Sequence, residues 1–329
     1  MTDFIPLIAL AAIAILFGFI GLVWSADRFV AGSAALANSF GVSALIIGLT
    51  IVSFGTSAPE IMVSLNASFV QAGDLAIGNA IGSNIANIAL VLAITLLISN
   101  IPVQKHLLQH EFPVLLFVTL LSGVFLFDGL LTPFEGWILL ILLPCVLMFL
   151  IAIKKRSITP QEATQETEDI PDMSRKHAII WFIVGLVVLM ISSKILVWGA
   201  ETTAVYFNVS PLIIGLTVIA IGTSLPELAA SVASALKGHH DIALGNIIGS
   251  NIFNLLAVMS LPGIIFPPIM GPEVFNRDFA TMLVVTLIVG GGVFFALKSK
   301  NTPPKLGKAT GLMLLASYIG YYAYLFTQS

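Results

Sequence analysis

The chain is a succession of long apolar segments separated by short polar ones. Most of the segments reach the roughly 20 residues that a helix needs to cross the hydrocarbon core of a bilayer. Backbone polar groups in lipid must be satisfied within the segment, so these runs predict helices rather than open strands. We expect an all-α polytopic membrane protein with ten transmembrane helices, over residues 4–24, 44–70, 75–98, 113–127, 134–153, 178–198, 211–236, 242–265, 279–297 and 306–326.

Polar residues interrupt the second and seventh of these segments at the same place. GTSAPE at 55–60 returns as GTSLPE at 222–227, and GNAIGSNIAN at 78–87 returns as GNIIGSNIFN at 245–254. One offset separates both pairs of motifs (227 − 60 = 167), so a unit has been duplicated. With five spans in each unit, an odd number, the second copy must cross the membrane in the opposite sense. The sequence therefore predicts two inverted five-helix repeats with broken helices 2 and 7.

Charged residues divide the chain and orient it. Residues 1–153 form the first repeat, 154–177 a hydrophilic linker, and 178–329 the second repeat. Lys and Arg concentrate on one predicted side, which by the positive-inside rule is cytoplasmic. That side holds Arg28, Lys105, the linker, Lys237, Lys298, Lys300, Lys305 and Lys308, whereas the other holds little beyond Arg277 and Lys194. We therefore expect an inner (plasma) membrane protein with both termini outside.

Composition excludes the soluble classes of protein. The chain is 58% hydrophobic and 9% charged, with a mean hydropathy of +1.04, against roughly 25% charged residues in a soluble domain. The net charge of −3 belongs to the loops, and no basic stripe points to nucleic acid. The single cysteine, Cys145, lies in an apolar segment and is expected to pack as a small apolar side chain.

Inverted repeats with a broken helix in each half are typical of secondary transporters whose site lies at mid-membrane. Pro59 has no N–H and so frees the carbonyl of Gly55 from the helix; Pro226 does the same in the second half. A carboxylate and a hydroxyl flank each break: Glu60 with Ser57, and Glu227 with Ser224.

The spacing of Ser57 and Glu60 also fits a capping box, which is the structural alternative. A charged carboxylate at the centre of a bilayer costs roughly 2.5 to 3.5 kcal/mol on insertion scales. A cap needs no charge, because glutamine would serve as well. This comparison favours a functional site over a cap.

The second motif supplies further oxygen ligands. Asn79, Ser83 and Asn87 recur at i, i+4 and i+8 and so share one helix face, as do their counterparts in the second half. We assign Ser83, Asn87, Ser250 and Asn254 as ligands. Interhelical hydrogen bonding is the favoured role of Asn79, Asn84, Asn246 and Asn251, and close helix packing that of Gly78, Gly82, Gly245 and Gly249. Carboxylate, amide and hydroxyl oxygens without nearby Cys or His describe a site for a hard cation, either calcium or the similarly sized sodium.

These paired motifs resemble the α1 and α2 repeats of the sodium/calcium exchanger family, within the calcium:cation antiporters, in its short prokaryotic form. The resemblance covers both halves of the chain. It implies antiport of several sodium ions against one calcium ion by alternating access. It also implies that spans one and six slide against a rigid bundle of the other eight.

The resemblance implies a ligand set as well. Glu60 and Glu227 would bind calcium together with the carbonyls of Thr56 and Thr223. Sodium would use Ser57, Ser224, Ser83, Ser250 and the backbone at Ser53 and Ala220, with Asn87 and Asn254 lining the middle. Some members carry Asp at the position of Asn254, which leaves the sodium stoichiometry and any potassium coupling open. The ions are substrates, no cofactor is implied, and one monomer would suffice for transport, while the oligomeric state stays open.

Three alternatives remain beside sodium-coupled exchange. A proton-coupled calcium antiporter would share the fold and the carboxylates. A cation channel could use the same oxygens but would not need inverted broken helices. An intramembrane protease is the weakest, because no GxGD, Ser/His dyad or HExxH motif occurs, so the chain is not expected to be an enzyme.

Overall fold

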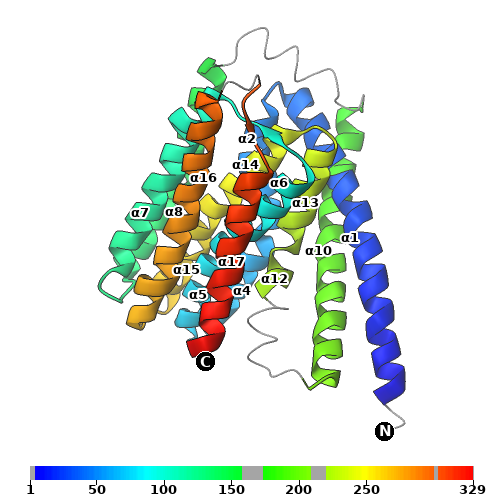
Figure 1. The fold of residues 1–329 in the computed structure, drawn as a ribbon, viewed down its shortest axis with the longest axis vertical. Coiled ribbons are helices and arrows are strands. Elements are labelled where there is room, and N and C mark those ends of the chain that lie inside the picture. Colours follow the sequence, from blue (N-terminus) through cyan, green and yellow to red (C-terminus); the bar gives the residue numbers. More distant parts are fainter. Residues whose placement is uncertain (1–3, 158–172, 209–219, 300–302, 329) are drawn as a thin grey trace.

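The computed structural model describes residues 4–157, 173–208, 220–299 and 303–328. Within these ranges the chain is almost entirely helical (Figure 1), and eight helices are long and apolar enough to cross a membrane. A ninth candidate span is the bent pair Ala44–Thr56 and Ala58–Phe69. The expected polytopic helical membrane protein is therefore confirmed.

The first half contains α1 (Phe4–Phe40), the broken segment α2–η1–α3–α4, and a continuous helix made of α5, η2 and α6. Its last part contains η3, α7 and α8. The bounds are α2 Ala44–Ile47, η1 Gly48–Val52, α3 Ser53–Thr56, α4 Ala58–Phe69, α5 Gly73–Ala86, η2 Asn87–Leu92, α6 Ala93–Ile98, β1 Ile101–Pro102, η3 Leu107–Glu111, α7 Phe112–Leu126 and α8 Pro133–Ser157.

The second half repeats this order with a nearly constant offset. Elements α13, α14, η5, α15 and η6 each begin 167 residues after α4, α5, η2, α6 and η3. The bounds are α10 Arg175–Tyr206, α12 Ala220–Thr223, α13 Leu225–Leu236, α14 His240–Phe253, η5 Asn254–Val258, α15 Ser260–Ile265, η6 Val274–Phe279, α16 Ala280–Lys298, β2 Lys305–Leu306 and α17 Lys308–Gln328. The duplication seen in the sequence thus extends to the helix boundaries and to the π-helical turns.

Several predicted boundaries are wrong, most of all at the first and sixth spans. The expected helices over 4–24 and 178–198 extend to Phe40 and over Arg175–Tyr206. Both contain glycines at which the paired backbones nearly touch: a Cβ added at Gly32 would lie 2.5 Å from the Phe182 nitrogen, and one at Gly185 would lie 2.6 Å from the Phe29 nitrogen. This packing keeps α1 helical through residues 25–40, which include many small residues and lie beyond the first predicted span. The fourth and ninth spans also begin earlier, at Leu107 and Val274.

Other expectations fall on residues that the structure does not describe. The seventh span was expected over 211–236, of which positions 211–219 lie outside the described residues. Its remaining part consists of the short helices α12 and α13, which are separated by the break at Ser224. Most of the expected linker, 158–172, also lies outside them. Cys145 was expected to be packed, but it is exposed on α8, because it lies on the outer face of that helix.

The helices form two groups (Figure 1). On one side α1 and α10 run together along their length. On the other side α7, α8, α16 and α17 surround the central helices α5 and α14. In the most apolar window of His240–Ile265 every residue is buried, so α14 lies at the centre of the bundle. The start of α1 and the end of α17 lie at one end of the molecule, and the end of α8 and the start of α10 at the other.

A short two-stranded sheet links the two halves of the chain at one end of the bundle. Strands β1 and β2 pair antiparallel, with Ile101 opposite Leu306. These strands belong to the chain segments that follow α6 and precede α17, so the pair joins the two halves at the linker end. This two-residue pairing is the main departure from an all-α structure within the described ranges.

Candidate functional site

The two helix breaks have the same local geometry. Helix α3 ends at Thr56, Ser57 leaves helical geometry at φ −83° and ψ 5°, and α4 starts with Pro59 in its first turn. In the second half Ser224 has φ −89° and ψ 5° between α12 and α13. The first break bends the span by 45°. Because proline cannot donate to the carbonyl four residues earlier, each break releases one carbonyl from the helix, that of Gly55 or that of Gly222. The Gly222 carbonyl instead accepts a hydrogen bond of 3.1 Å from the Ser193 hydroxyl.

Each break places a glutamate in the first turn of the following helix. Glu60 and Glu227 are both 0% exposed and lie close enough to interact electrostatically. The Ser57 hydroxyl donates a hydrogen bond of 3.2 Å to Glu227 Oε1, which joins the first break to the carboxylate of the second. Among the described residues, neither oxygen of Glu60 nor Oε2 of Glu227 has a hydrogen-bond partner. The two carboxylates thus lie together, buried, with acceptor oxygens left over.

The capping alternative is wrong for both breaks. Neither Ser57 nor Ser224 makes a side-chain cap hydrogen bond. A true capping box occurs elsewhere in the chain, where Thr132 N donates to Glu135 Oε2 at 2.8 Å and Glu135 N donates to Thr132 Oγ1 at 3.4 Å. The spacing of a capping box therefore has different uses at the two places.

Further polar groups surround the carboxylates. Asn87 and Asn254, both 0% exposed, begin the π-helical turns η2 and η5. Within the part of the chain that the structure describes, their amide atoms and the Ser224 hydroxyl are buried without hydrogen-bond partners. π-Helical turns inside α-helices often occur at functional sites, although the sequence pattern did not predict them here.

The remaining expected ligands are distributed around this centre. Thr56 Oγ1 donates to Asn246 Oδ1 at 3.0 Å and lies 3.4 Å from Ser250 Oγ. Ser53, Ser83 and Ser250 are buried, whereas Thr223 is only half-buried. Ala220 begins α12. The structure thus brings Thr56, Ser57, Ser250 and Glu227 together through side-chain contacts that cross between the two halves.

The neighbouring asparagines hold the glutamate backbones. Asn79 Nδ2 donates to the Glu60 carbonyl at 3.2 Å, and Asn246 Nδ2 donates to the Glu227 carbonyl at 3.4 Å. Asn84 Nδ2 donates across the halves to the Asn251 carbonyl at 3.3 Å. The expected interhelical role is confirmed for these three residues. Asn251 differs, because its amide donates to Ile247 O in its own helix at 2.8 Å.

The expected close packing is confirmed for the glycines of α14. A Cβ added at Gly245 would lie 2.7 Å from the Leu45 carbonyl oxygen, and one at Gly249 would lie 2.6 Å from the Leu49 oxygen. Gly78 and Gly82 meet nothing within 4 Å among the described residues. Their counterpart surface would be 212–220, nearly all of which lies outside those residues, so this part of the prediction stays untested.

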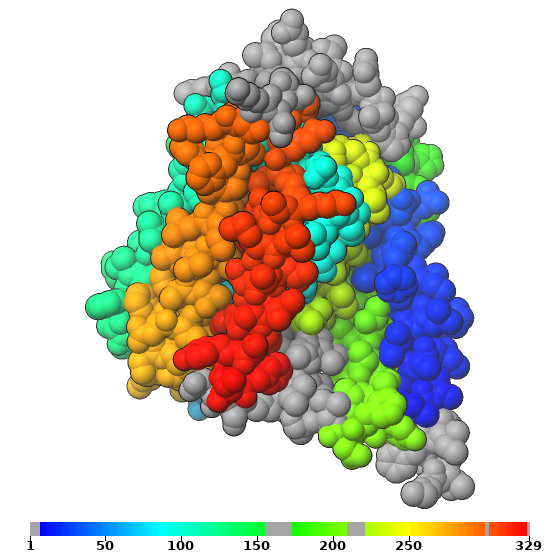
Figure 2. All heavy atoms as spheres, viewed as in Figure 1, coloured from blue at the N-terminus to red at the C-terminus, as the bar shows by residue number. Residues whose placement is uncertain are grey.

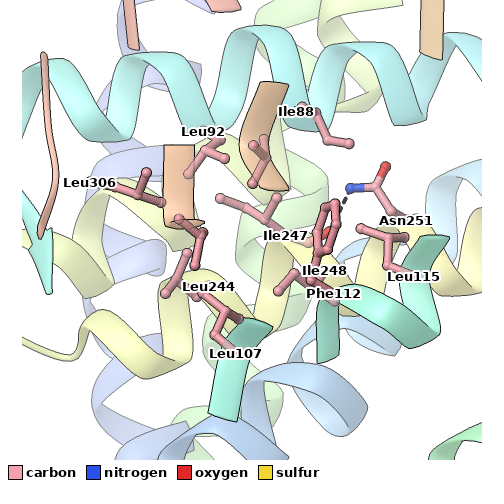
Figure 3. A pocket seen from close by; sticks show the side chains of 12 residues that line it. Ile88, Leu92, Leu107, Phe112, Leu115, Leu244, Ile247, Ile248, Asn251 and Leu306 are labelled. Atoms are coloured by element: carbon pink, nitrogen blue, oxygen red, sulfur yellow. Dashed lines mark hydrogen bonds between the residues drawn. The ribbon is translucent and has the colours of Figure 1, made fainter. Parts of the chain in front are cut away.

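An enclosed cavity lies near the site but has different chemistry. Figure 3 shows it between η2, α7 and α14, lined by Ile88, Leu92, Leu115 and other apolar side chains, with Asn251 at its edge. Its volume is about 20 Å³, room for about one water. The apolar walls make it a packing defect rather than an ion site.

Two charged clusters outside the motifs were missed by the sequence analysis. Glu111 accepts from His106 Nδ1 at 3.2 Å, and Lys154 Nζ lies 3.0 Å from His106 Nε2. In the second half Tyr321 OH donates to Asp278 Oδ1 at 2.9 Å. Glu111 and Lys154 stand 167 residues before Asp278 and Tyr321, so both clusters join the fourth and fifth spans of a repeat. The available signal was the ionisable residues at the ends of the predicted spans, because Glu111 and Asp278 lie just before the fourth and ninth spans and Lys154 directly follows the fifth.

The donor set at the breaks suits a hard cation. Two buried negative charges without a cation are unfavourable in a low-dielectric interior. The leftover oxygens belong to carboxylate, amide and hydroxyl groups, the ligands that calcium and sodium prefer over nitrogen or sulfur. The described residues contain no group of three or more His, Cys, Asp or Glu side chains that could hold a metal ion, so neutral oxygens would have to complete the coordination of the two glutamates.

The fold and the site together define a membrane transporter for cations. The family model of the sodium/calcium exchanger protein matches residues 10–152 and 177–327. The chain therefore belongs to the sodium/calcium exchanger family, whose members are transporters and not enzymes.

Similar proteins cover nearly the whole chain. A protein named CaxA from Alkalimonas amylolytica is 44% identical, over 96% of this chain and 99% of the relative. The inner membrane protein YrbG of Escherichia coli is 38% identical, over 96% and 97%. A solved structure of the sodium-calcium exchanger NCX_Mj, soaked with sodium, superposes with a TM-score of 0.82 at 32% identity, over 96% of this chain and 99% of that one.

Proposed function

We propose that this protein is a secondary antiporter that exchanges sodium ions for calcium across the membrane by alternating access. The carrying observation is the pair of buried glutamates, Glu60 and Glu227, with three carboxylate oxygens unpartnered among the described residues. Two negative charges balance one divalent ion, and they also balance monovalent ions bound at adjacent positions. The membership of the chain in the exchanger family and its likeness to NCX_Mj support the same function.

The buried charges explain why the protein would couple the movements of the two ions and would not let either ion leak across the membrane alone. Moving two uncompensated carboxylates through a low-dielectric state costs far more than moving them with bound cations. The site therefore changes its access side only when it is filled. Because either calcium or sodium can fill it, inward movement of one is coupled to outward movement of the other.

The ligand roles follow the expectation from sequence. Glu60, Glu227 and the carbonyls of Thr56 and Thr223 bind calcium. Ser57, Ser224, Ser83, Ser250 and the backbone at Ser53 and Ala220 bind sodium, while Asn87 and Asn254 line the centre. The contact from Ser57 to Glu227 supports shared occupancy, because one hydroxyl reaches the calcium carboxylate of the other half.

The membrane arrangement is ten spans in two inverted repeats, 1–153 and 178–329, joined by a cytoplasmic linker at 154–177. The shared end of α1 and α17 in Figure 1 supports termini on one side, and the excess of Lys and Arg at the opposite end supports that side being outside. The relative YrbG is named an inner membrane protein, in keeping with an inner-membrane location. The separate α1–α10 pair is the moving part of the cycle.

The test is calcium uptake into vesicles reconstituted with the purified protein. Sodium-loaded vesicles diluted into sodium-free medium should accumulate radioactive calcium, and a sodium ionophore should stop the uptake. Empty vesicles and the double variant Glu60→Gln, Glu227→Gln are the controls. Uptake that ignores sodium would refute sodium coupling.

The second candidate is a proton-coupled calcium antiporter, because paired buried carboxylates can also bind protons. An imposed pH gradient without sodium separates the two. Calcium uptake that follows the pH gradient alone supports the proton-coupled function, and its absence supports exchange with sodium.

A further inference from the structure

An open groove runs between the last two helices of the second half. It lies between the start of α16 and the end of α17, which are side by side in Figures 1 and 2. Its volume is about 410 Å³. It is lined by Asn276, Arg277, Ala280, Thr281, Val284, Val285, Ser317, Tyr321 and Tyr324.

The polar end of the groove is organised around one guanidinium. Arg277 Nε donates to Asp278 Oδ1 at 2.7 Å, and its Nη2 donates to Oδ2 at 3.1 Å. Tyr321 OH also donates to Asp278, so the carboxylate is held from two helices. A guanidinium carries five N–H donors, and the contacts to Asp278 use only two of them. The contacts to Asp278 therefore hold Arg277 at the groove and leave its three other N–H groups for a further acceptor.

The groove becomes apolar toward the middle of the membrane. Arg277 lies near the beginning of the span Val274–Lys298, at the depth of the headgroups. Val284 lies seven residues further on, about 10 Å deeper at 1.5 Å per residue. The groove therefore has a cationic mouth at the interface and a largely apolar slot below it, in which the Thr281 and Ser317 hydroxyls donate to carbonyls one turn earlier in their own helices.

The first half contains a groove built from the same positions. It lies between α7 and α8, has a volume of about 500 Å³, and includes Gln109, His110, Pro113, Val114 and Phe117. Each of these stands 167 residues before Asn276, Arg277, Ala280, Thr281 and Val284 respectively. An amide and a basic residue thus stand at the mouth in both halves, which indicates a feature of the repeat rather than an accident of side-chain placement.

We propose that the groove between α16 and α17 binds a phospholipid, with its phosphate on Arg277 and an acyl chain in the slot. The groove opens on the outer surface of spanning helices, where lipid is the neighbouring molecule. Arg277 is the one cation among the described lining residues, and the phosphodiester is the anion that a bilayer presents at this depth. The imidazole of His110 has no permanent charge, so the equivalent groove of the first half holds phosphate more weakly.

This site is separate from the ion site. None of its lining residues belongs to the two motifs, and its occupancy does not depend on the coupling ion. A failure of sodium-driven calcium uptake would therefore leave the lipid proposal unaffected, and the reverse also holds.

The test is native mass spectrometry of the delipidated protein titrated with dioleoyl phosphatidylglycerol. The wild type should retain one lipid. Arg277→Gln should need roughly tenfold more lipid, the effect of losing one charge-assisted hydrogen bond. Val284→Trp, which fills the slot and leaves Arg277 in place, should also lose the bound lipid. The matched control is Leu287→Trp on the same helix, because Leu287 is 48% exposed, close to the 54% of Val284, but does not line the groove.

Retention by Leu287→Trp together with loss in the other two variants supports the proposal. Equal retention by all four proteins would overturn it, and so would a wild type that binds no lipid or that forms a dimer through this face instead. Val284→Trp keeps the test decisive even if Arg277→Gln unfolds after losing the partner of Asp278.

Discussion

Replacing Glu60 or Glu227 by glutamine tests the site most directly. Each substitution keeps the size of the side chain and removes one negative charge from a fully buried position. At an effective dielectric constant of 20, two unit charges 4 Å apart interact by about 4 kcal/mol. If half of this survives desolvation, the loss is about 2 kcal/mol, and a divalent ion would feel more. We therefore expect calcium affinity to fall at least ~30-fold, with normal membrane insertion.

The assay is sodium-driven uptake of radioactive calcium in vesicles, with the calcium concentration varied for each variant. Glu135→Gln is the matched control, because Glu135 belongs to the true capping box with Thr132 and should exchange calcium like the wild type. Glu60→Gln keeps the Ser57 contact to Glu227 intact, so its defect would report the charge alone. Wild-type calcium affinity in both glutamine variants of the site would refute the argument, because the carboxylates would then not be ligands.

Three further outcomes follow from the same structure. Asn254→Asp adds a titratable group at the centre, and we expect calcium exchange to persist with a new pH dependence when flux is measured across neutral pH. Gly245→Val should lower the free energy of unfolding in detergent by about 1 to 3 kcal/mol, seen as a lower thermal midpoint, because its Cβ would meet the Leu45 carbonyl. The control Gly320→Val should leave the midpoint unchanged, because a Cβ there meets nothing within 4 Å among the described residues. In a Cys145→Ala background, a cysteine at Thr164 should react only from the cytoplasm, and cysteines at the termini only from outside; the opposite labelling would reverse the orientation.

The sequence alone determined the class of the protein and the positions of its helix breaks and of the polar residues beside them. Long apolar runs admit only helices in a bilayer, and proline has the same effect on a helix in any context. The breaks at Ser57 and Ser224, the burial of both glutamates and the roles of Asn79 and Asn246 were therefore open to prediction. The repeated motifs also carried the family membership, because they preserve spacing as well as residue type.

Other features depended on contacts between distant segments. The length of α1 and α10 follows from glycine packing between them, which local composition does not show, since small residues are equally common in loops. The rejection of the capping box at Ser57 also needed the tertiary structure, because Ser57 and Thr132 have the same spacing to a glutamate and differ in what their side chains contact. Ser57 turns to Glu227, 170 residues away, and the π-helical turns that begin at Asn87 and Asn254 were likewise seen only in the structure. Local spacing decides which groups a helix can present, and the fold alone decides which partner each group meets.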